Sequence, residues 1–409
     1  MTTALVIFIL TYLVVAGQKL PYLHLDRPSG ALLGAVLMVW TGVLTQNEAV
    51  AAIHFDTILL LLGMMILSGY LMEAGFFRWC ACWAIRLART PRGFLAGLVF
   101  ISGGLSALFV NDTICLMLTP LVLEACRETE TEPLPFLLAL ATSANIGSVA
   151  TLTGNPQNMI VGTHSGWSYA GFALKMIPIA LGGLLLDWAF LRWKFRSAIP
   201  NVCFLSQVQR PPVDLVLLLK GVAVTAFVLG GFLTGYRLSG MAMAGATAMV
   251  LAARIPPSRA LARVDWSLIL FFSGLFVVVE GLHRVGWGDA FFRAVSPYFG
   301  SGVFSQLATF SGFAVLASNL VSNVPLVLVA TPWVPRFADP PVFWLALAMA
   351  STFAGNLTLV GSVANVIVVE LSKAQVRIRF RDFLWVGIPI TVLSTVWGLV
   401  VLWIYMAMG

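Results

Sequence analysis

Polar side chains interrupt four unusually long apolar segments of this chain. The segments cover 98–120, 138–162, 313–332 and 345–370, and each carries Asn, Thr, Gly, Pro or Asp near its middle. Breaks of this kind free backbone N–H groups that bind anions, and carbonyl or amide oxygens that bind cations. We therefore predict one ion-binding site formed by Asn111, Asp112, Thr113, Asn145, Thr151, Asn155, Asn158, Asn323, Asn356, Thr358 and Asn365.

Asp112 is the only carboxylate among these groups. An ionised carboxylate deep in an apolar environment costs several kcal/mol unless it is paired, coordinated or protonated. We predict that Asp112 exchanges a proton or holds a cation. The alternative is that it only caps the helix that follows it, because the helix dipole favours an acidic residue in the first turn.

The four interrupted segments form two pairs of related sequence. NDTICLMLTPLV at 111–122 matches NVPLVLVATPWV at 323–334, which lies 212 residues later. TLTGNPQNMIV at 151–161 matches TLVGSVANVIV at 358–368, 207 residues later. Polar residues shared at a nearly constant spacing predict a tandem duplication of halves about 200 residues long.

The amino-acid composition indicates that much of this protein lies in lipid and not in water. Of its 409 residues, 59% are hydrophobic and only 10% are charged, and the mean hydropathy is +0.94. Soluble domains carry about 25% charged residues. The chain is therefore predicted to be an all-α polytopic membrane protein. Its net charge of +7 comes from cations in short loops, without the basic stripe that nucleic-acid binding requires.

The positions of the cations predict how the two halves cross the membrane. RPSG at 27–30 matches RLSG at 237–240, so both halves start alike. If 95–122 and 303–331 are re-entrant hairpins, each half has five spans, and 23 loop cations divide 18 to 5 between the two sides. The alternative, in which both segments cross once, divides them 9 to 14. The positive-inside rule favours the first arrangement.

Five spans per half make the two repeats inverted, with both termini outside the cytoplasmic membrane. The first repeat is predicted over 1–196, with its hairpin at about 95–122 and a broken helix at about 135–163. A cytoplasmic linker at 197–212 follows. The second repeat covers 213–409, with its hairpin at about 303–331 and a broken helix at about 342–370. Near the end of the first repeat, Asp187 is predicted to form an ion pair with Arg192 or Lys194.

The motifs NDTICLMLTP, ATSANIGSVATLTGNPQNMIVG, SNLVSNVPLVLVATP and STFAGNLTLVGSVANVIVVE resemble the ion transporter superfamily. The resemblance covers essentially the whole chain and is greatest to the branch of arsenite permeases, sodium/proton antiporters and anion permeases. It implies secondary transport by an elevator-like motion of the hairpins and broken helices, and a homodimer as a common assembly. Sodium-coupled dicarboxylate carriers of this superfamily have Ser-Asn-Thr at both hairpin tips, whereas this chain has Val110-Asn111-Asp112 and Ser322-Asn323-Val324.

These observations predict a secondary active transporter for a small inorganic ion of the arsenite or oxyanion class, coupled to protons. A sodium/proton antiporter, a sodium-coupled carboxylate symporter and a passive channel are the alternatives. An intramembrane enzyme is not expected, because no His-Glu-x-x-His or comparable catalytic motif is present. We expect no cofactor, no metal site and no nucleic-acid partner. A Gly-Lys-Thr loop for ATP is absent, so energy comes from an ion gradient or from a separate soluble ATPase subunit.

Overall fold

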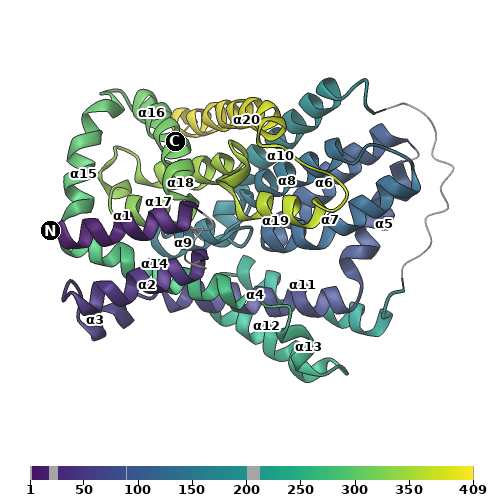
Figure 1. Cartoon of the computed structure of the whole chain (residues 1–409), viewed down its shortest axis with the longest axis horizontal. Coiled ribbons are helices and arrows are strands. Elements are labelled where there is room, and N and C mark those ends of the chain that lie inside the picture. The colour runs from purple at the N-terminus through teal and green to yellow at the C-terminus, as the bar shows by residue number, and fades with distance from the viewer. Residues whose placement is uncertain (1, 18–25, 89, 200–211, 409) are drawn as a thin grey trace.

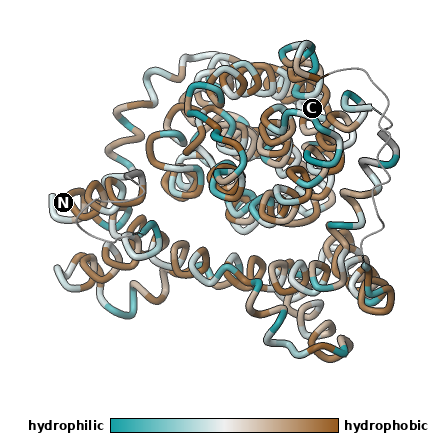
Figure 2. Tube along the Cα trace, turned by 45° about the vertical axis from the view of Figure 1, so that its right-hand side comes forward, coloured by the Kyte–Doolittle hydropathy of each residue, from teal (hydrophilic) through white to brown (hydrophobic). Residues whose placement is uncertain are grey.

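The computed structural model describes residues 2–17, 26–88, 90–199 and 212–408, and within these ranges it contains helices and no strand. The predicted all-α fold is therefore confirmed. Most of the predicted linker, residues 200–211, lies outside the described residues. The helices fall into two groups, which Figure 2 shows as a ring of helices with a row of helices beneath it.

The row of helices is named the layer. It contains helices from the beginning of each half (Figure 1). Its members are α1 (Thr2–Gly17), α2 (Arg27–Trp40), α3 (Gln46–Ala51), α4 (Phe55–Glu73), α11 (Leu215–Leu233), α12 (Leu238–Ala252), α13 (Pro257–Leu261) and α14 (Trp266–Arg284). The two closest helix pairs in the layer are α2 with α14 and α4 with α12. Each pair contains one helix from each half of the chain.

Small residues bring these pairs together at equivalent positions of the two halves. A Cβ on Gly63 of α4 would lie 2.6 Å from the backbone of Ala242 in α12. A Cβ on Gly274 of α14 would lie 2.7 Å from the backbone of Ala31 in α2. Gly63 and Gly274 are 211 residues apart, as are Ala31 and Ala242. Close backbone approach through small residues is how helices associate when lipid removes the hydrophobic driving force.

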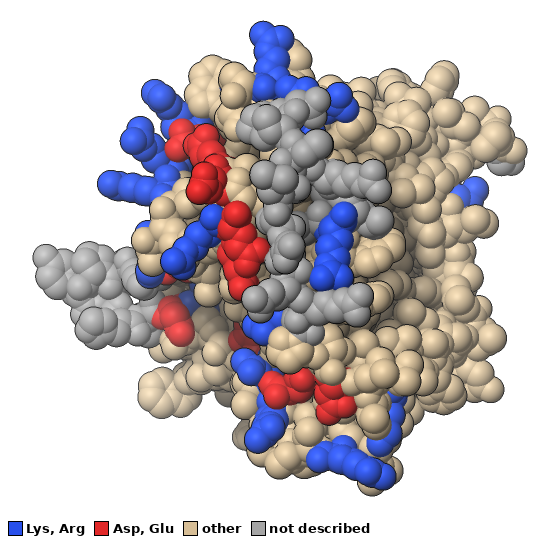
Figure 3. Space-filling view, turned by 90° about the vertical axis from the view of Figure 1, so that its right-hand side faces the viewer, with Lys and Arg blue, Asp and Glu red and all other residues tan. Residues whose placement is uncertain are grey.

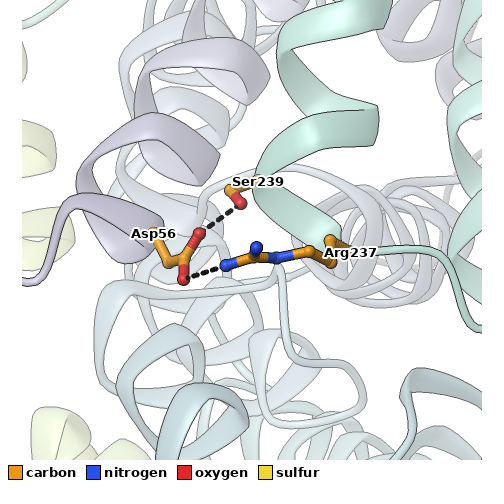
Figure 4. Close-up of polar contacts among 3 residues, drawn as sticks. All are labelled: Asp56, Arg237 and Ser239. Carbon is orange, nitrogen blue, oxygen red and sulfur yellow. Dashed lines mark hydrogen bonds and ion pairs between the residues drawn. The ribbon is translucent and has the colours of Figure 1, made fainter.

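Ion pairs at both ends of α4 fix its direction relative to α12. Asp56 at the start of α4 pairs with Arg237, which directly precedes α12, at 2.9 Å (Figure 4). Glu73 at the end of α4 pairs with Arg263, which follows α13, at 3.0 Å. The two helices therefore run in parallel.

The second group is named the bundle, and it contains the interrupted segments. Its members are α5 (Phe76–Ala88), α6 (Pro91–Leu108), α7 (Asn111–Glu128), α8 (Leu134–Ser148), α9 (Pro156–His164), α10 (Tyr169–Lys194), α16 (Val303–Val321), α17 (Asn323–Ala330), α18 (Pro340–Phe353), α19 (Val363–Ser372) and α20 (Phe380–Met408). Helix α15 (Trp287–Val295) leads from the layer to the bundle.

All four interrupted segments contain a helix break. Between α6 and α7 only Phe109 and Val110 are non-helical, and between α16 and α17 the break is Ser322 alone. Ser322 has a φ of 74° and a ψ of 156°, a backbone region that is occupied almost only by glycine and costs another residue about 1–3 kcal/mol. The longer breaks lie at 149–155, before α9, and at 354–362, before α19. Asn155 accepts a hydrogen bond from Asn158 N–H and so caps α9.

The surface is apolar over wide areas. Seven helices in the described part of the chain are long and apolar enough to cross a membrane. Large apolar side chains point outward from them, for example Leu174 of α10, Leu219 of α11 and Val396 of α20. Figure 3 shows the charged side chains gathered over one part of the view, with a broad uncharged expanse to the right. Apolar surface of this extent needs lipid to cover it.

The prediction that Asp187 forms an ion pair with Arg192 or Lys194 is wrong. The side chain of Asp187 is fully buried, and its two carboxylate oxygens lie 3.0 and 3.2 Å from the hydroxyl of Thr142 on α8, which donates to them. The two cations lie over aromatic rings instead, Arg192 over Trp188 and Lys194 over Trp385. Since Asp187 is on α10, its bond with Thr142 joins two bundle helices.

Glycines allow α6 and α8 to touch, and this contact can be tested. A Cβ on Gly147 would lie 2.1 Å from the carbonyl oxygen of Gly103, whereas a Cβ on Gly104 would meet nothing within 4 Å. Replacing Gly147 with Ala should destabilise the bundle by about 1–3 kcal/mol, because two backbones would have to separate. The measurement is the melting temperature of the purified protein. Gly104→Ala is the matched control and should melt like the wild type or slightly higher.

Candidate ion-binding site

Asn145 is the centre of a hydrogen-bonded amide network where the helix breaks meet. Its Oδ1 accepts from Asn111 Nδ2 and from the Ser362 hydroxyl, both at 2.9 Å. Its Nδ2 donates to Oδ1 of Asn356 at 2.8 Å and to Oδ1 of Asn365 at 3.0 Å. Both donors and both acceptor sites of this side chain are therefore used. The network links the start of α7 and the end of α8 to the break between α18 and α19.

The other amides of the network hold the broken backbone. Asn356 Nδ2 donates to the carbonyl oxygen of Thr142 on α8 at 3.1 Å. Asn365 Nδ2 donates to Gly355 O at 2.7 Å and to Thr358 O at 3.1 Å. A buried carbonyl left without a donor costs about 1–3 kcal/mol, so these bonds stabilise a backbone that cannot form helical ones.

The same bonds recur in the first half. Asn158 Nδ2 donates to Ser148 O at 3.2 Å and to Thr151 O at 2.9 Å. Adding 207 residues to these three positions gives Asn365, Gly355 and Thr358, which make the matching bonds.

The two threonines at these positions also behave alike. Thr151 donates from its hydroxyl to Ala107 O on α6, and Thr358 donates to Asn319 Oδ1 on α16. Each therefore ties a broken helix to the helix that precedes the shorter break of its own half. Asn155 adds a link between the halves, because its Nδ2 lies 3.1 Å from Oγ1 of Thr352.

A small cavity lies beside the network, between the two short breaks and the layer. Asn111, Asp112, Ser322, Asn323 and Ser362 line it from the bundle. Its volume is about 40 Å³, which is room for water or a small ion. Arg27 of α2, together with Leu268, Phe271 and Phe272 of α14, lines it from the layer.

Two side chains in this cavity are prepared for a ligand. Oδ1 of Asn323 is buried and has no hydrogen-bond partner among the described residues. The carboxylate of Asp112 faces the backbone N–H of Ala364, in the first turn of α19, and the charge of Arg27. A buried unsatisfied amide oxygen in a polar cavity indicates a place for a donor or a cation.

The predicted residues therefore divide by position. Asn111, Asn145, Asn356 and Asn365 share the network, and Asn111, Asp112 and Asn323 reach the cavity. Thr151, Asn155, Asn158 and Thr358 hold the breaks open around them. Thr113 lies half-buried in the first turn of α7. Among the described residues, no cluster of three or more His, Cys, Asp or Glu side chains forms a metal site.

Arg27 and Gln157 also line the cavity, although the predicted site did not include them. The signal for Arg27 was present, since RPSG recurs as RLSG, but it indicated only the register of the repeat. Gln157 was hidden because it stands next to Asn158 in the first turn of α9 and has no counterpart at Ala364.

Comparison with known proteins identifies the family. The family model described as citrate transporter matches residues 5–339, most of the chain. This chain belongs to the citrate transporter family. It is therefore a membrane transporter and not an enzyme, and the predicted resemblance to the ion transporter superfamily is confirmed.

Curated relatives cover the whole chain. The rice protein named silicon efflux transporter LSI3 is 32% identical over 93% of this chain and 93% of its own. A transporter named arsB from Dictyostelium discoideum is 27% identical over 96% of this chain and 90% of its own. The 46 kDa membrane protein of Mycobacterium leprae is 31% identical over 99% of both.

The fold also occurs in solved structures. One of them is the YdaH transporter of Alcanivorax borkumensis, described as having an unusual topology, with a TM-score of 0.63 at 14% identity. The match covers 100% of this chain and 97% of that one.

The central role of Asn145 can be tested by removing its amide. Asn145→Ala leaves four partner groups without their bonds, each costing about 1–3 kcal/mol if it stays buried. We expect Asn145→Ala to lose transport, and Asn111→Ala and Asn323→Ala to impair it at normal membrane abundance. Uptake by proteoliposomes is the measurement, and the exposed Asn47→Ala of α3 is the control. Wild-type kinetics in the three site variants would show that the ion binds elsewhere.

Proposed function

We propose that this protein is a secondary active transporter that moves a small inorganic ion of the arsenite or oxyanion class across the cytoplasmic membrane, coupled to protons. The apolar surface and the family membership support a transport function. The amide network supports the proposed location of the ion-binding site. The name of one relative supports the substrate class, because silicon efflux refers to a small inorganic species.

The observation that best supports a carrier mechanism is that the two halves of the bundle contact the layer unequally. Helix α9 packs on α4, and α17 packs on α14. Of their repeat counterparts, α19 packs mainly on α7, and α7 packs on α19 and other bundle helices with only a slight contact to α4. Beside α7 a cavity of about 690 Å³ separates the bundle from Glu73, Asp214 and Arg263 of the layer side. A chain built of two similar halves is thus closed on one side and open on the other.

Alternating access would exchange these two arrangements. In this proposal the bundle carries the amide network past the layer, so that the cavity beside α7 closes while its counterpart at α19 opens. The predicted orientation makes the present opening cytoplasmic. At the closed side the rings of His54 and His164 join α4 to α9, with centroids 4.8 Å apart. Burial, and the nearby His164, lower the pKa of His54, which favours the uncharged form of that ring.

A carboxylate substrate is the alternative that the family description raises. The cavity at the hairpin tips offers one guanidinium, Arg27, beside one carboxylate, Asp112. A citrate carries several negative charges, and Asp112 would repel them. A small hydroxylated acid or a monovalent oxyanion fits this balanced pair of charges better. Counterflow in proteoliposomes with arsenite, silicic acid, phosphate and citrate tests the substrate class directly, and saturable exchange separates a carrier from a channel.

Asp112 is proposed as the coupling residue, and its amide variant tests this. Asp112→Asn keeps a polar side chain of the same shape in the first turn of α7 but cannot release a proton. We expect the variant to lose accumulation driven by a proton gradient while it retains exchange of substrate for substrate. Both are measured in proteoliposomes. Accumulation with an unchanged pH dependence would mean that Asp112 is only a cap.

The orientation of the chain is a separate prediction. We expect both termini outside and the segments around 86–92, 192–210, 254–263 and 373–381 in the cytoplasm, because this arrangement places 18 of 23 loop cations inside. Single cysteines introduced at the termini and in these segments are labelled from one side of intact cells with a membrane-impermeant reagent. A terminus that is labelled only from the cytoplasm would contradict the inverted arrangement.

The assembly partners stay proposals as well. The resemblance implies a homodimer, and a separate soluble ATPase subunit would replace the ion gradient as the energy source. Transport by the purified chain alone, driven by an imposed proton gradient, would show that the subunit is not needed.

A further inference from the structure

Arg27 brings a fixed positive charge into the cavity that contains Asp112. It is the first residue of α2 and is half-buried there. Its charge attracts that of Asp112, and it forms no ion pair of its own within the described part of the chain. A guanidinium keeps its proton at every physiological pH. The cavity therefore contains one permanent charge and one that can be titrated.

The repeat equivalent of Arg27 is placed differently. Arg237, 210 residues later, pairs with Asp56 at 2.9 Å, and Ser239 donates to the other oxygen of Asp56 at 2.6 Å (Figure 4). The side chain of Arg237 is 82% exposed. Of two equivalent arginines, one is neutralised within the layer at the surface, and the other faces a carboxylate of the bundle.

Arg27 and Asp112 belong to the two parts that transport would displace. Arg27 is on α2 of the layer, which packs on α14 and α1, while Asp112 is on α7 of the bundle. A cation near a carboxylate favours its ionised form, and withdrawal of the cation favours the protonated form. A shift of the bundle therefore changes the charge that Asp112 prefers.

The other charged and polar groups around Asp112 are few. Asp265, which caps α14 in the layer, repels it. The N–H of Ala364 on α19 faces it, and the thiol of Cys115 lies one turn further along α7. Among these groups Arg27 is the only cation.

We propose that Arg27 is a positioning residue that weakens the hold of Asp112 on its proton, against the repulsion by Asp265, in the conformation described here. The proton passes from the carboxyl oxygen to water in the cavity, and the carboxylate that remains is balanced by Arg27. Proton release is thereby tied to the place of the bundle against the layer. This inference rests on the proposed coupling role of Asp112 and deepens it, since it names the group that times the release.

The test measures the proton on Asp112 directly and needs no transport. The infrared band of the protonated carboxyl is titrated in purified protein in lipid, and it is assigned by its loss in Asp112→Asn. In Arg27→Gln the midpoint should move to higher pH by about one unit, a tenfold tighter proton. Arg27→Lys should keep the wild-type midpoint. Arg237→Gln is the matched control and should also keep it, because an exposed ion pair contributes little.

A second variant keeps the test decisive if Arg27→Gln is not recovered from membranes. Asp265→Asn retains the cap of α14 but removes the repelling charge, so its midpoint should move to lower pH. Equal midpoints in Arg27→Gln, Arg237→Gln and the wild type would overturn the inference, even if Asp112→Asn loses accumulation. A shifted midpoint together with normal accumulation by Asp112→Asn would refute the coupling role alone. The two failures are therefore distinguishable.

Discussion

The amide of Asn145 is the interaction on which the arrangement of the bundle depends. Four helix breaks inside a membrane protein leave N–H and C=O groups that neither lipid nor water can satisfy. Asn145 joins the break of one half to that of the other, and Asn356 and Asn365 pass the bonds on to the backbone. Without this network the breaks would be a cost with no compensation. With it they become a rigid site of fixed geometry.

Duplication explains how such a network can arise from few residue types. Asn158 and Asn365 make the same two bonds at positions 207 residues apart, and Gly63 and Gly274 make the same close helix contact. One local solution for a broken helix is used twice. The two copies then differ where function requires it, for example Asp112 against Val324 and Arg27 against Arg237.

The sequence predicted the parts of this structure that local chemistry determines. Composition and apolar segments predict the all-α membrane fold, and Asn, Gly and Pro within those segments predict where the helices break. It did not predict which side chains meet across the halves, because contacts such as Asn145 with Asn356 depend on packing that no spacing encodes. Asp187 shows the same limit. Its cations are near in sequence, yet its partner is Thr142, 45 residues away on another helix. The inverted arrangement of the repeats stays a prediction.

The two repeats carry different charges at equivalent positions, which two identical repeats could not do. Two carboxylates at the hairpin tips would repel each other, and two free arginines would hold any anion at both faces alike. With Val324 at the position equivalent to Asp112, the two hairpin tips contain a single carboxylate. Arg237 pairs with Asp56, whose other oxygen accepts a hydrogen bond from Ser239, so of these two equivalent arginines it is Arg27 that faces the bundle without an ion pair. In the proposed alternating-access cycle, the duplicated scaffold would provide two equivalent positions for the bundle, and the unequal charges would give those positions different affinities for a proton. Protonation would then depend on the position of the bundle, which proton-coupled transport requires.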